Sequence, residues 1–498
     1  MKKIILIFLA IFCTKQDYLF SKDIQKPNII IVMIDDAGYG DYACLGNPVS
    51  ITPNVDRFKK ESVLFTQFHV SPSCSPTRSM LMTGRHEMKS GVTHTTHGRD
   101  RVNLTVPMLP KVLKKAGYAT GMFGKWHLGN AEEYRPESRG YDEVLMHGSG
   151  GIGQLGDAPN NKYHNPTLWH KTKFEKHEGF CTDIFFSNAI AWMDKQRQEN
   201  KPFFTYIPLN VIHAPHTPRD SDYEKYLKHR QINPERARYY GLLENADYNF
   251  GVLLDKLEKW GIAKNTIVLF LGSDNGATLG KEVFNDHMRG GKGEVYQGGT
   301  RVPLFVRWTD GGVAKNKSCA TLTSAMDIFP TLATITGAEI PKGVEGIDLM
   351  NYLKQPNLPT DPERILVHHR TRWPHGATVE KFKYQSCSIQ NERFTLVNNK
   401  ELYDLSVDRG ETNNVIDKHP EVVKEFRAYY DAWWEESKKH LINDYRTDKY
   451  CFSTFRDLYA KQYGQDAADE AWELGKKAFA DFRKKYLEDK GAKNPRFK

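Results

Sequence analysis

The sequence contains few cysteines and no paired metal-binding cysteines. Only seven occur among 498 residues, and no two of them are spaced as CxxC. This pattern argues against a zinc ribbon and against a dense disulfide framework. We therefore expect most thiols to be free and buried, with at most two disulfide bridges within the chain.

Long apolar runs are missing after the first residues. The opening MKKIILIFLAIFC joins two lysines to an apolar run of about ten residues, which is typical of a secretory signal. A membrane-spanning helix needs roughly 18 apolar residues, so we predict no membrane span. We expect residues 1–21 to be a signal peptide and the protein to be exported, to the periplasm or the extracellular space. Lipidation of Cys13 is less favoured, because Phe12 stands where a small residue normally precedes a lipidated cysteine.

A nucleic-acid signature is also absent. The formal net charge is +9, but no basic run is interleaved with aromatic residues and no nucleic-acid module is recognisable. Solvated lysines and an anionic ligand both agree with this charge, which alone does not choose between them. We therefore predict no nucleic-acid partner, and the sequence leaves the oligomeric state open.

The chain does contain runs of aliphatic and β-branched residues that are typical of buried strands. Three of them end in polar residues: PNIIIVMIDD (27–36), PFFTYIPLN (202–210) and NTIVLFLGSDNG (265–276). Amphipathic helical patterns such as ENADYNFGVLLDKLEKWG (244–261) separate these strands. The alternation predicts an α/β fold with a mostly parallel central sheet flanked by helices. In such sheets the chemistry lies at the carboxyl ends of the strands.

The sequence pattern changes after about residue 375. ERFTLVNNKELYDL (392–405) predicts a hairpin that turns at Asn398 and Asn399, and charged amphipathic helices follow it. We therefore predict a catalytic domain over residues 22–375 and a smaller C-terminal α+β subdomain, with a small antiparallel sheet and helices, over residues 376–498.

Hard oxygen ligands follow two of the predicted strands. Asp35 and Asp36 end the first strand, and Asp274 with Asn275 ends a later one. Carboxylate and amide oxygens without thiolate or imidazole partners suit Ca²⁺ or Mg²⁺. Each pair alone is also typical of a turn or a helix cap. A parallel sheet would bring both pairs to one edge, which favours a metal site.

Cationic and imidazole side chains gather in three further segments. In GMFGKWHLG (121–129), Lys125 and His127 stand two residues apart, so in extended backbone they share a face. NVIHAPHTP contributes His213 and His216, and Lys292 lies in a glycine-rich loop. Such groups hold an anion and move protons. Each segment alone is also compatible with surface lysines and histidines that only stabilise the fold.

Taken together, these segments resemble the sulfatase family of the alkaline-phosphatase-like superfamily. CSPTRSMLMTGR (74–85) and GYATGMFGKWHLG (117–129) are similar to its two signatures. Three further landmarks occur in the family's order: PNIIIVMIDDAGYGDYACLG, LGSDNGA and GGKGEVYQGGTRVP. The resemblance covers about residues 27–308, and weaker segments extend it past residue 415. It implies the alkaline-phosphatase-like fold and sulfate ester hydrolysis.

The resemblance also implies a role for Cys74. In this family the cysteine is oxidised to formylglycine (3-oxoalanine) by a formylglycine-generating enzyme, and the aldehyde hydrates to a geminal diol. One hydroxyl can attack sulfur, and the other can then expel sulfate by cleavage of the carbon–oxygen bond. A buried structural thiol is the alternative for Cys74.

Further site residues are implied by the same resemblance. Ca²⁺ would be bound by Asp35, Asp36, Asp274 and Asn275, with an oxygen of modified Cys74 or of the sulfate as a further ligand. Arg78 would hydrogen-bond the diol and the metal-binding carboxylates. Asp274 would be a plausible base for the attacking hydroxyl.

The remaining implied roles concern proton transfer and the substrate. Lys125 would hold the nucleophile and a sulfate oxygen, and His127 would take the proton that triggers sulfate release. His213, favoured over His216, and Lys292 would lie over the leaving oxygen. We expect His216 and Arg301 to contact the substrate.

The substrate itself is predicted only as a sulfated carbohydrate. Two segments, 86–101 and 146–170, are rich in glycine, asparagine, histidine and aromatic residues, which suits sugar-binding loops but also ordinary exposed loops. The sequence does not identify the sugar, the hydroxyl or whether attack is at a chain end. Two alternatives remain: a phosphoester or phosphonate ester hydrolase on the same scaffold, and a catalytically dead glycan-binding protein.

Overall fold

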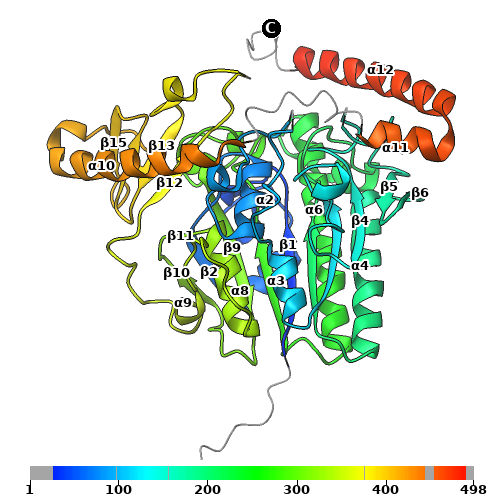
Figure 1. The fold of residues 1–498 in the computed structure, drawn as a ribbon, viewed down its shortest axis with the longest axis horizontal. Helices are drawn as coiled ribbons and strands as arrows, with labels where there is room; N and C mark the ends of the chain where they lie inside the picture. The colour runs from blue at the N-terminus through cyan, green and yellow to red at the C-terminus, as the bar shows by residue number, and fades with distance from the viewer. Residues whose placement is uncertain are drawn as a thin grey trace, which may run out of the picture.

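The computed structural model describes residues 26–96, 98–154, 156–230, 232–374, 376–442 and 454–489. Within them the chain forms a large eleven-stranded sheet with helices on both faces, and a separate four-stranded sheet (Figure 1). The predicted fold class, a mostly parallel α/β sheet with a smaller C-terminal sheet, is confirmed. The predicted signal peptide lies outside the described residues.

The large sheet has the strand order β10-β2-β9-β8-β1-β7-β3-β4-β5-β6, and β11 pairs with β2. Its central strands β8, β1, β7, β3 and β4 run parallel to one another. Strand β9 is antiparallel to both of its neighbours, β8 and β2, and β5 is antiparallel to β4 and β6. The strands are β1 Asn28–Met33, β2 Val63–His69, β3 Ala119–Lys125, β4 Glu143–His147, β5 Thr167–His170, β6 Lys173–Lys176, β7 Phe203–Pro208, β8 Thr266–Leu271, β9 Arg301–Arg307, β10 Lys317–Cys319 and β11 Thr323–Ser324.

Strand β1 shows why both faces of this sheet are covered. Its side chains alternate between two apolar cores: Ile29, Ile31 and Met33 face one, and Ile30 and Val32 face the other. A strand buried on both faces reads as a continuous aliphatic run, which is the pattern that predicted it. The apolar run therefore correctly indicated that β1 is buried between two cores.

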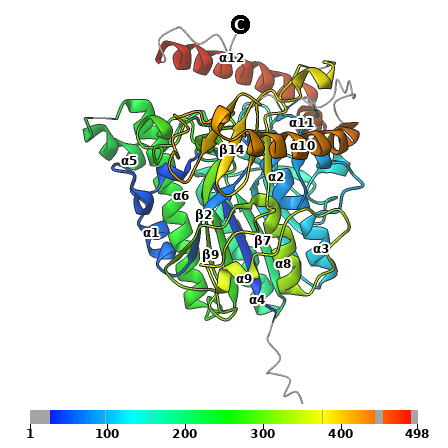
Figure 2. The same cartoon turned by 90° about the vertical axis from the view of Figure 1, so that its left-hand side faces the viewer.

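The helices form two layers around this sheet (Figure 2). Helices α2, α3 and α8 contribute to the first core, and α1, α4 and α6 contribute to the second. The helices are α1 Pro53–Lys59, α2 Cys74–Thr83, α3 Leu109–Lys115, α4 Cys181–Gln198, α5 Asp220–Tyr223, α6 Pro234–Lys259, α7 Gln297–Thr300, α8 Ile328–Thr336, α9 Met350–Lys354, α10 Pro420–Ser437, α11 Thr454–Tyr463 and α12 Gln465–Asp489.

The small sheet is an antiparallel meander against which α10 packs. Its strands are β12 Leu366–His369, β13 Cys387–Gln390, β14 Phe394–Val397 and β15 Glu401–Asp404. The predicted hairpin is present, and both residues of its turn, Asn398 and Asn399, have positive φ, as a tight hairpin turn requires.

Two features of the predicted domain division differ from the structure. The small sheet begins at Leu366, ten residues before the predicted boundary. The sequence did not reveal this first strand, because β12 has only four residues, two of them histidines, and shows no recognisable alternation. The C-terminal helices α11 and α12 also do not pack on the small sheet. Instead Phe455 and Tyr459 of α11 join the core of the large sheet. Helix α11 therefore packs with the large sheet.

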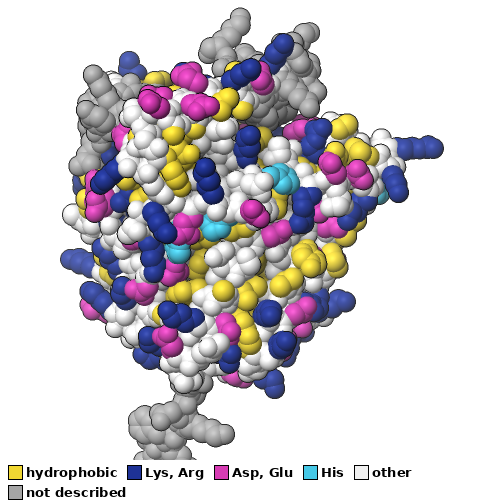
Figure 3. Space-filling model, turned by 90° about the vertical axis from the view of Figure 1, so that its right-hand side faces the viewer, with side chains coloured by type: hydrophobic (Ala, Val, Ile, Leu, Met, Phe, Trp, Pro, Cys, Tyr) yellow, Lys and Arg dark blue, Asp and Glu magenta, His cyan; other side chains and the backbone are white. Residues whose placement is uncertain are grey.

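The described residues also test two simpler predictions. The five cysteines among them, at positions 44, 74, 181, 319 and 387, are free thiols, as expected. No helix in the described ranges is long and apolar enough to cross a membrane. On the face in Figure 3, lysine and arginine side chains are interspersed with acidic ones rather than gathered in a stripe.

Candidate active site

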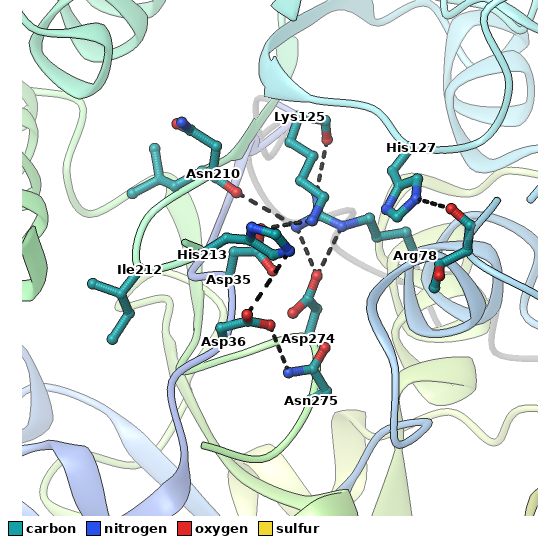
Figure 4. A network of polar contacts seen from close by, with 12 residues as sticks. Asp35, Asp36, Arg78, Lys125, His127, Asn210, Ile212, His213, Asp274 and Asn275 are labelled. Atoms are coloured by element: carbon teal, nitrogen blue, oxygen red, sulfur yellow. Dashed lines mark hydrogen bonds and ion pairs between the residues drawn. The ribbon is translucent and has the colours of Figure 1, made fainter. Parts of the chain in front are cut away.

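The polar residues that end the parallel strands meet at one edge of the large sheet (Figure 4). Asp35 and Asp36 follow β1, Lys125 ends β3, and Asp274 follows β8. His213 lies beyond the end of β7. Because these strands run parallel and adjacent, their carboxyl ends carry these side chains to a common point, as the sequence predicted.

Cys74 is the first residue of α2 and lies at this point. It follows β2, and its side chain is buried. Its Sγ atom and one carboxylate oxygen from each of Asp35 and Asp274 lie within 4.8 Å of one another. The cysteine is therefore placed beside the carboxylates and is not isolated in the apolar core.

Two buried cations fix these carboxylates. Arg78, one turn after Cys74, reaches Asp274 Oδ2 with Nε and Nη2 at 2.9 and 2.7 Å, and its Nη1 donates to the carbonyl oxygen of Lys125 at 2.7 Å. The Nζ atom of Lys125 donates to Asp35 Oδ2 at 2.6 Å. All of these side chains are fully buried, so removing one partner would leave an uncompensated charge.

Three oxygens of this cluster remain unsatisfied. Asp35 Oδ1, Asp274 Oδ1 and Asn275 Oδ1 are buried and accept no hydrogen bond from the described residues. Burial and the neighbouring Asp274 raise the pKa of Asp35 well above its ordinary value, although Lys125 opposes the shift. Buried polar atoms normally have partners. Unsatisfied carboxylate and amide oxygens at one point therefore fit a hard divalent cation.

Asp36 has different partners from Asp35 and Asp274. It has a positive φ of 68°, which is uncommon for a residue other than glycine and occurs often at functional sites. Its Oδ1 accepts from Lys292 Nζ and from Asn275 Nδ2. Burial would raise the pKa of Asp36, but Lys292 and His213 hold it well below its usual range. The carboxylate is therefore charged and paired with a lysine.

His127 carries a free nitrogen within the site. Its Nε2 is 2.8 Å from the carbonyl oxygen of Thr95, and a carbonyl can only accept, so Nε2 carries the proton. Nδ1 is buried and has no hydrogen-bond partner in the described part of the chain. Burial, together with the charge of Lys125, lowers the pKa of His127 to about 3. A neutral imidazole with an open Nδ1 can accept a proton.

The structure separates the two histidines of NVIHAPHTP. His213 Nε2 lies 4.0 Å from Asp36 Oδ2, and its Nδ1 is 2.7 Å from the carbonyl oxygen of Ala214. His216 instead uses both ring nitrogens elsewhere, with Nδ1 2.5 Å from Glu235 and Nε2 3.1 Å from the carbonyl oxygen of Ile212. The structure therefore brings His213 into the cluster and leaves His216 outside it.

Arg301 is also not brought to the cluster. Its Nε donates to the carbonyl oxygen of Thr66 at 2.6 Å, its Nη1 pairs with Asp286 at 3.2 Å, and its guanidinium lies over the ring of Tyr39. Its guanidinium thus forms an ion pair with Asp286 in the loop before β9. The spacing of a motif does not reveal such local partners, which is why the sequence grouped Arg301 and His216 with the substrate.

A glycine loop after β4 contributes to the site in a way that the motifs did not show. A Cβ atom at Gly150 would lie 2.7 Å from Cε1 of His127, and one at Gly151 would lie 3.0 Å from Nδ1 of His213. The buried carboxylate of Asp157 accepts from the backbone nitrogens of Gly148 and Gly153, at 2.8 and 2.9 Å. The carboxylate therefore holds both ends of the loop against the two histidines.

His147 is a further residue that sequence reasoning missed. It ends β4 and pairs in register with Lys125 of β3. Its Nε2 is buried and accepts or donates no hydrogen bond within the described ranges, and burial lowers its pKa to about 3. In the sequence, His147 ends the short run VLMH. Its position beside Lys125 can be inferred only once this run is known to be a strand parallel to β3.

A pocket of about 700 Å³ opens from the cluster. The cluster side chains Asp36, His213 and Lys292 form its inner end, and the segment after the glycine loop forms one side. Cations, neutral histidines and oxygens suited to a metal lie around a buried cysteine beside this pocket. This arrangement fits the hydrolysis of an ester of a tetrahedral anion with the help of a metal ion.

Comparison with known proteins makes this class specific. The family model Sulfatase matches residues 27–338, and the model for the C-terminal part of N-sulphoglucosamine sulphohydrolase matches residues 287–439. N-acetylgalactosamine-6-sulfatase of Mus musculus is 31% identical over 401 residues, covering 74% of each chain. The uncharacterized sulfatase YdeN of Escherichia coli K12 is 28% identical over 500 residues, covering 84% of this chain and 87% of that protein.

A solved structure agrees with these relatives. Ps i-CgsB in complex with k-i-k-neocarrahexaose is similar with a TM-score of 0.75 and 26% identity, covering 89% of this chain and 99% of that chain. The chain belongs to the sulfatase family and is a sulfuric ester hydrolase.

Proposed function

We propose that this protein hydrolyses sulfate esters on a sulfated carbohydrate, with Ca²⁺ as its metal and Cys74 converted to formylglycine. Family membership implies a metal and a formylglycine in general. The observation that carries the proposal is the meeting of Cys74 with the carboxylates of Asp35 and Asp274, whose free oxygens lack partners among the described residues. The saccharide part is supported by the N-acetylgalactosamine-6-sulfatase relatives and by the oligosaccharide complex of Ps i-CgsB.

The donor set fits calcium, the metal that the family resemblance implies. Asp35, Asp36, Asp274 and Asn275 would hold the ion, with an oxygen at position 74, and all of these ligands are oxygens, as Ca²⁺ prefers. When bound, the ion would polarise the sulfate and offset the negative charge that develops during the reaction. The three carboxylates are already oriented by Arg78, Lys125 and Lys292, and Asn275 donates a hydrogen bond to Asp36.

Position 74 would supply the nucleophile. A formylglycine, made there by a formylglycine-generating enzyme, would supply a hydrated aldehyde that attacks sulfur with one hydroxyl and allows sulfate release through the other. Beside position 74, Arg78 pairs with Asp274 in a fully buried ion pair. Lys125, which donates to Asp35, would hold the nucleophile and a sulfate oxygen.

Protons would move through the two histidines. His127 presents its unprotonated Nδ1 to the site, so it would accept the hydroxyl proton that accompanies sulfate release. His213 and Lys292 line the inner end of the pocket, where the leaving oxygen of a bound ester would lie. Asp36 raises the pKa of Lys292 above its ordinary value, against the effect of burial, so this lysine holds its proton.

A sulfate-release screen tests this function. The purified protein, produced together with a formylglycine-generating enzyme, is incubated with defined sulfated saccharides, with 4-nitrophenyl sulfate and with 4-nitrophenyl phosphate. We expect sulfate release from at least one saccharide and faster cleavage of the aryl sulfate than of the phosphate. Faster phosphate cleavage would contradict the proposal, and binding without turnover would indicate a glycan-binding protein. Export to the periplasm or extracellular space remains part of the proposal.

A further inference from the structure

The outer wall of the pocket comes from the end of the chain. Among the residues that line it are Gly475 and Ala478 of α12, together with Asn160 and Lys162 of the segment after β4. These two walls are more than 300 residues apart in the sequence. The inner end of the same pocket is formed by His213 and Lys292 of the reaction centre. The C-terminal helix therefore borders the space that leads to the chemistry.

Helix α11 holds α12 in this position by docking on the edge of the large sheet. The side-chain amide of Gln462 accepts from the backbone nitrogen of Phe174 at 2.7 Å and donates to its carbonyl oxygen at 2.8 Å. It thereby satisfies the exposed backbone of the edge strand β6, as a further strand would. The ring of Phe455 packs at 5.3 Å from that of Phe174 and at 5.8 Å from that of Trp169. These hydrogen bonds and ring contacts fix α11 against the sheet edge, and α12 continues directly from α11.

Small residues allow α12 to approach without filling the pocket. A Cβ atom at Gly475 would lie only 3.1 Å from the backbone nitrogen of Asn160, so the helix and the loop are close there. Ala478, one turn further on, lines the pocket but is exposed, so its methyl group faces open space. The helix therefore closes one side of the pocket and leaves its interior free.

The charges of the lining indicate the occupant. Lys162 and His164 are exposed on the pocket wall, while the acidic Asp36 at the inner end is paired with Lys292. The volume of about 700 Å³ lies in the upper part of the range for small-molecule sites. A pocket of this size, with the exposed Lys162 on its wall and the leaving-group end beside it, suits an anionic saccharide chain.

We propose that α12 is the outer wall of a binding subsite for the sugar units that adjoin the reacting sulfate ester, and that it selects sulfated oligosaccharides over small esters. This inference rests on the proposed function, because it assumes that the reaction centre cleaves a sulfate ester. The Ala478 position contacts the saccharide beyond the reacting unit, and Lys162 binds its negative charge from the opposite wall.

The test compares two tryptophan variants of the same helix. Ala478→Trp places a large ring in the pocket, whereas Ala480→Trp, at an exposed alanine outside the pocket lining, is its matched control. The probes are 4-nitrophenyl sulfate as substrate, with tetrasaccharides of chondroitin sulfate, heparin and carrageenan, and inorganic sulfate, as competing inhibitors. We expect Ala478→Trp to weaken inhibition by the best tetrasaccharide by about tenfold, and to change aryl hydrolysis and inhibition by sulfate much less.

A second variant keeps the test valid if Ala478→Trp misfolds. Lys162→Ala, on the facing wall, should weaken the same tetrasaccharide selectively, while Ala480→Trp should behave as the unmodified sequence does. The inference is overturned if no tetrasaccharide inhibits better than sulfate, if both tryptophan variants act alike, or if aryl hydrolysis falls as much as tetrasaccharide inhibition. A wild-type protein that binds a tetrasaccharide selectively but cleaves no ester would instead overturn the proposed function alone.

Discussion

The reaction centre and the pocket that adjoins it are built in different ways. Charged side chains at the ends of parallel strands form the centre, and buried ion pairs such as Arg78–Asp274 and Lys125–Asp35 fix them. The outer pocket is formed by glycine, asparagine and glutamine residues and by helix α12. Ion pairs do not dominate this lining as they do in the reaction centre. Chemistry therefore depends on a small, rigid set of groups, whereas recognition depends on segments that meet only in the folded chain.

The largest effect is expected from breaking the reaction centre at Asp274. Asp274→Ala removes a free oxygen suited to the metal and leaves Arg78 buried without its counter-charge. We expect turnover of any sulfate ester to fall by a factor on the order of 10³ or more. Calcium binding, measured by calorimetry, should be lost as well.

The control for this variant is Asp255→Ala, which removes an exposed carboxylate that pairs with Arg57 on the surface. It should leave turnover and calcium binding unchanged. An Asp274→Ala protein that still binds calcium with the same stoichiometry would remove this residue from the metal site.

The next effect separates the two histidines. His213→Ala should slow esters with poor leaving groups by about a hundredfold, and esters with good aryl leaving groups much less, because only poor leaving groups need a proton. The measurement is kcat for a series of aryl sulfates of different leaving-group pKa. His216, which is held by Glu235 outside the cluster, should not give this pattern when replaced by alanine. If it does, the assignment of the two residues is wrong.

A smaller effect is expected at Gly150, where the glycine loop after β4 contacts His127 of the reaction centre. Gly150→Ala would bring a methyl group to within 2.7 Å of His127, so the ring or the loop must shift. We expect kcat to fall roughly tenfold, because small displacements of a proton-transfer group slow catalysis. The unfolding temperature, measured alongside, should change little. Unchanged kcat would show that the loop does not position the histidine.

The smallest effect concerns histidines far from the chemistry. Burial lowers the pKa of His368 and of His369, both in β12, to about 4. The unfolded chain binds these protons from about pH 6.5 downward, while the folded chain does not bind them until pH 4. Stability is therefore lost as the pH falls through this window. His369→Phe should make the loss shallower by about 1.4 kcal/mol per pH unit, which urea unfolding at pH 7, 6 and 5 would measure. An unchanged slope would show that His369 is protonated in the folded state.

The sequence predicted the reaction centre better than its surroundings, for physical reasons. A strand buried on both faces must be aliphatic throughout, so β1 and β8 were evident, and the residues after them followed. By contrast, His147 ends the shorter strand β4, and Asp157 acts through the backbone of a loop that carries no distinctive pattern. The position of α12 was not predictable, because an amphipathic helix does not reveal which apolar surface it covers.

The most direct test of the account measures position 74 itself. Preparations of the protein with different degrees of maturation are examined by mass spectrometry of the peptide that contains Cys74, and the same preparations are assayed for sulfate release with calcium present. We expect activity to rise in proportion to the fraction that carries an aldehyde in place of the thiol. Full activity in a preparation in which every Cys74 remains a thiol would contradict it.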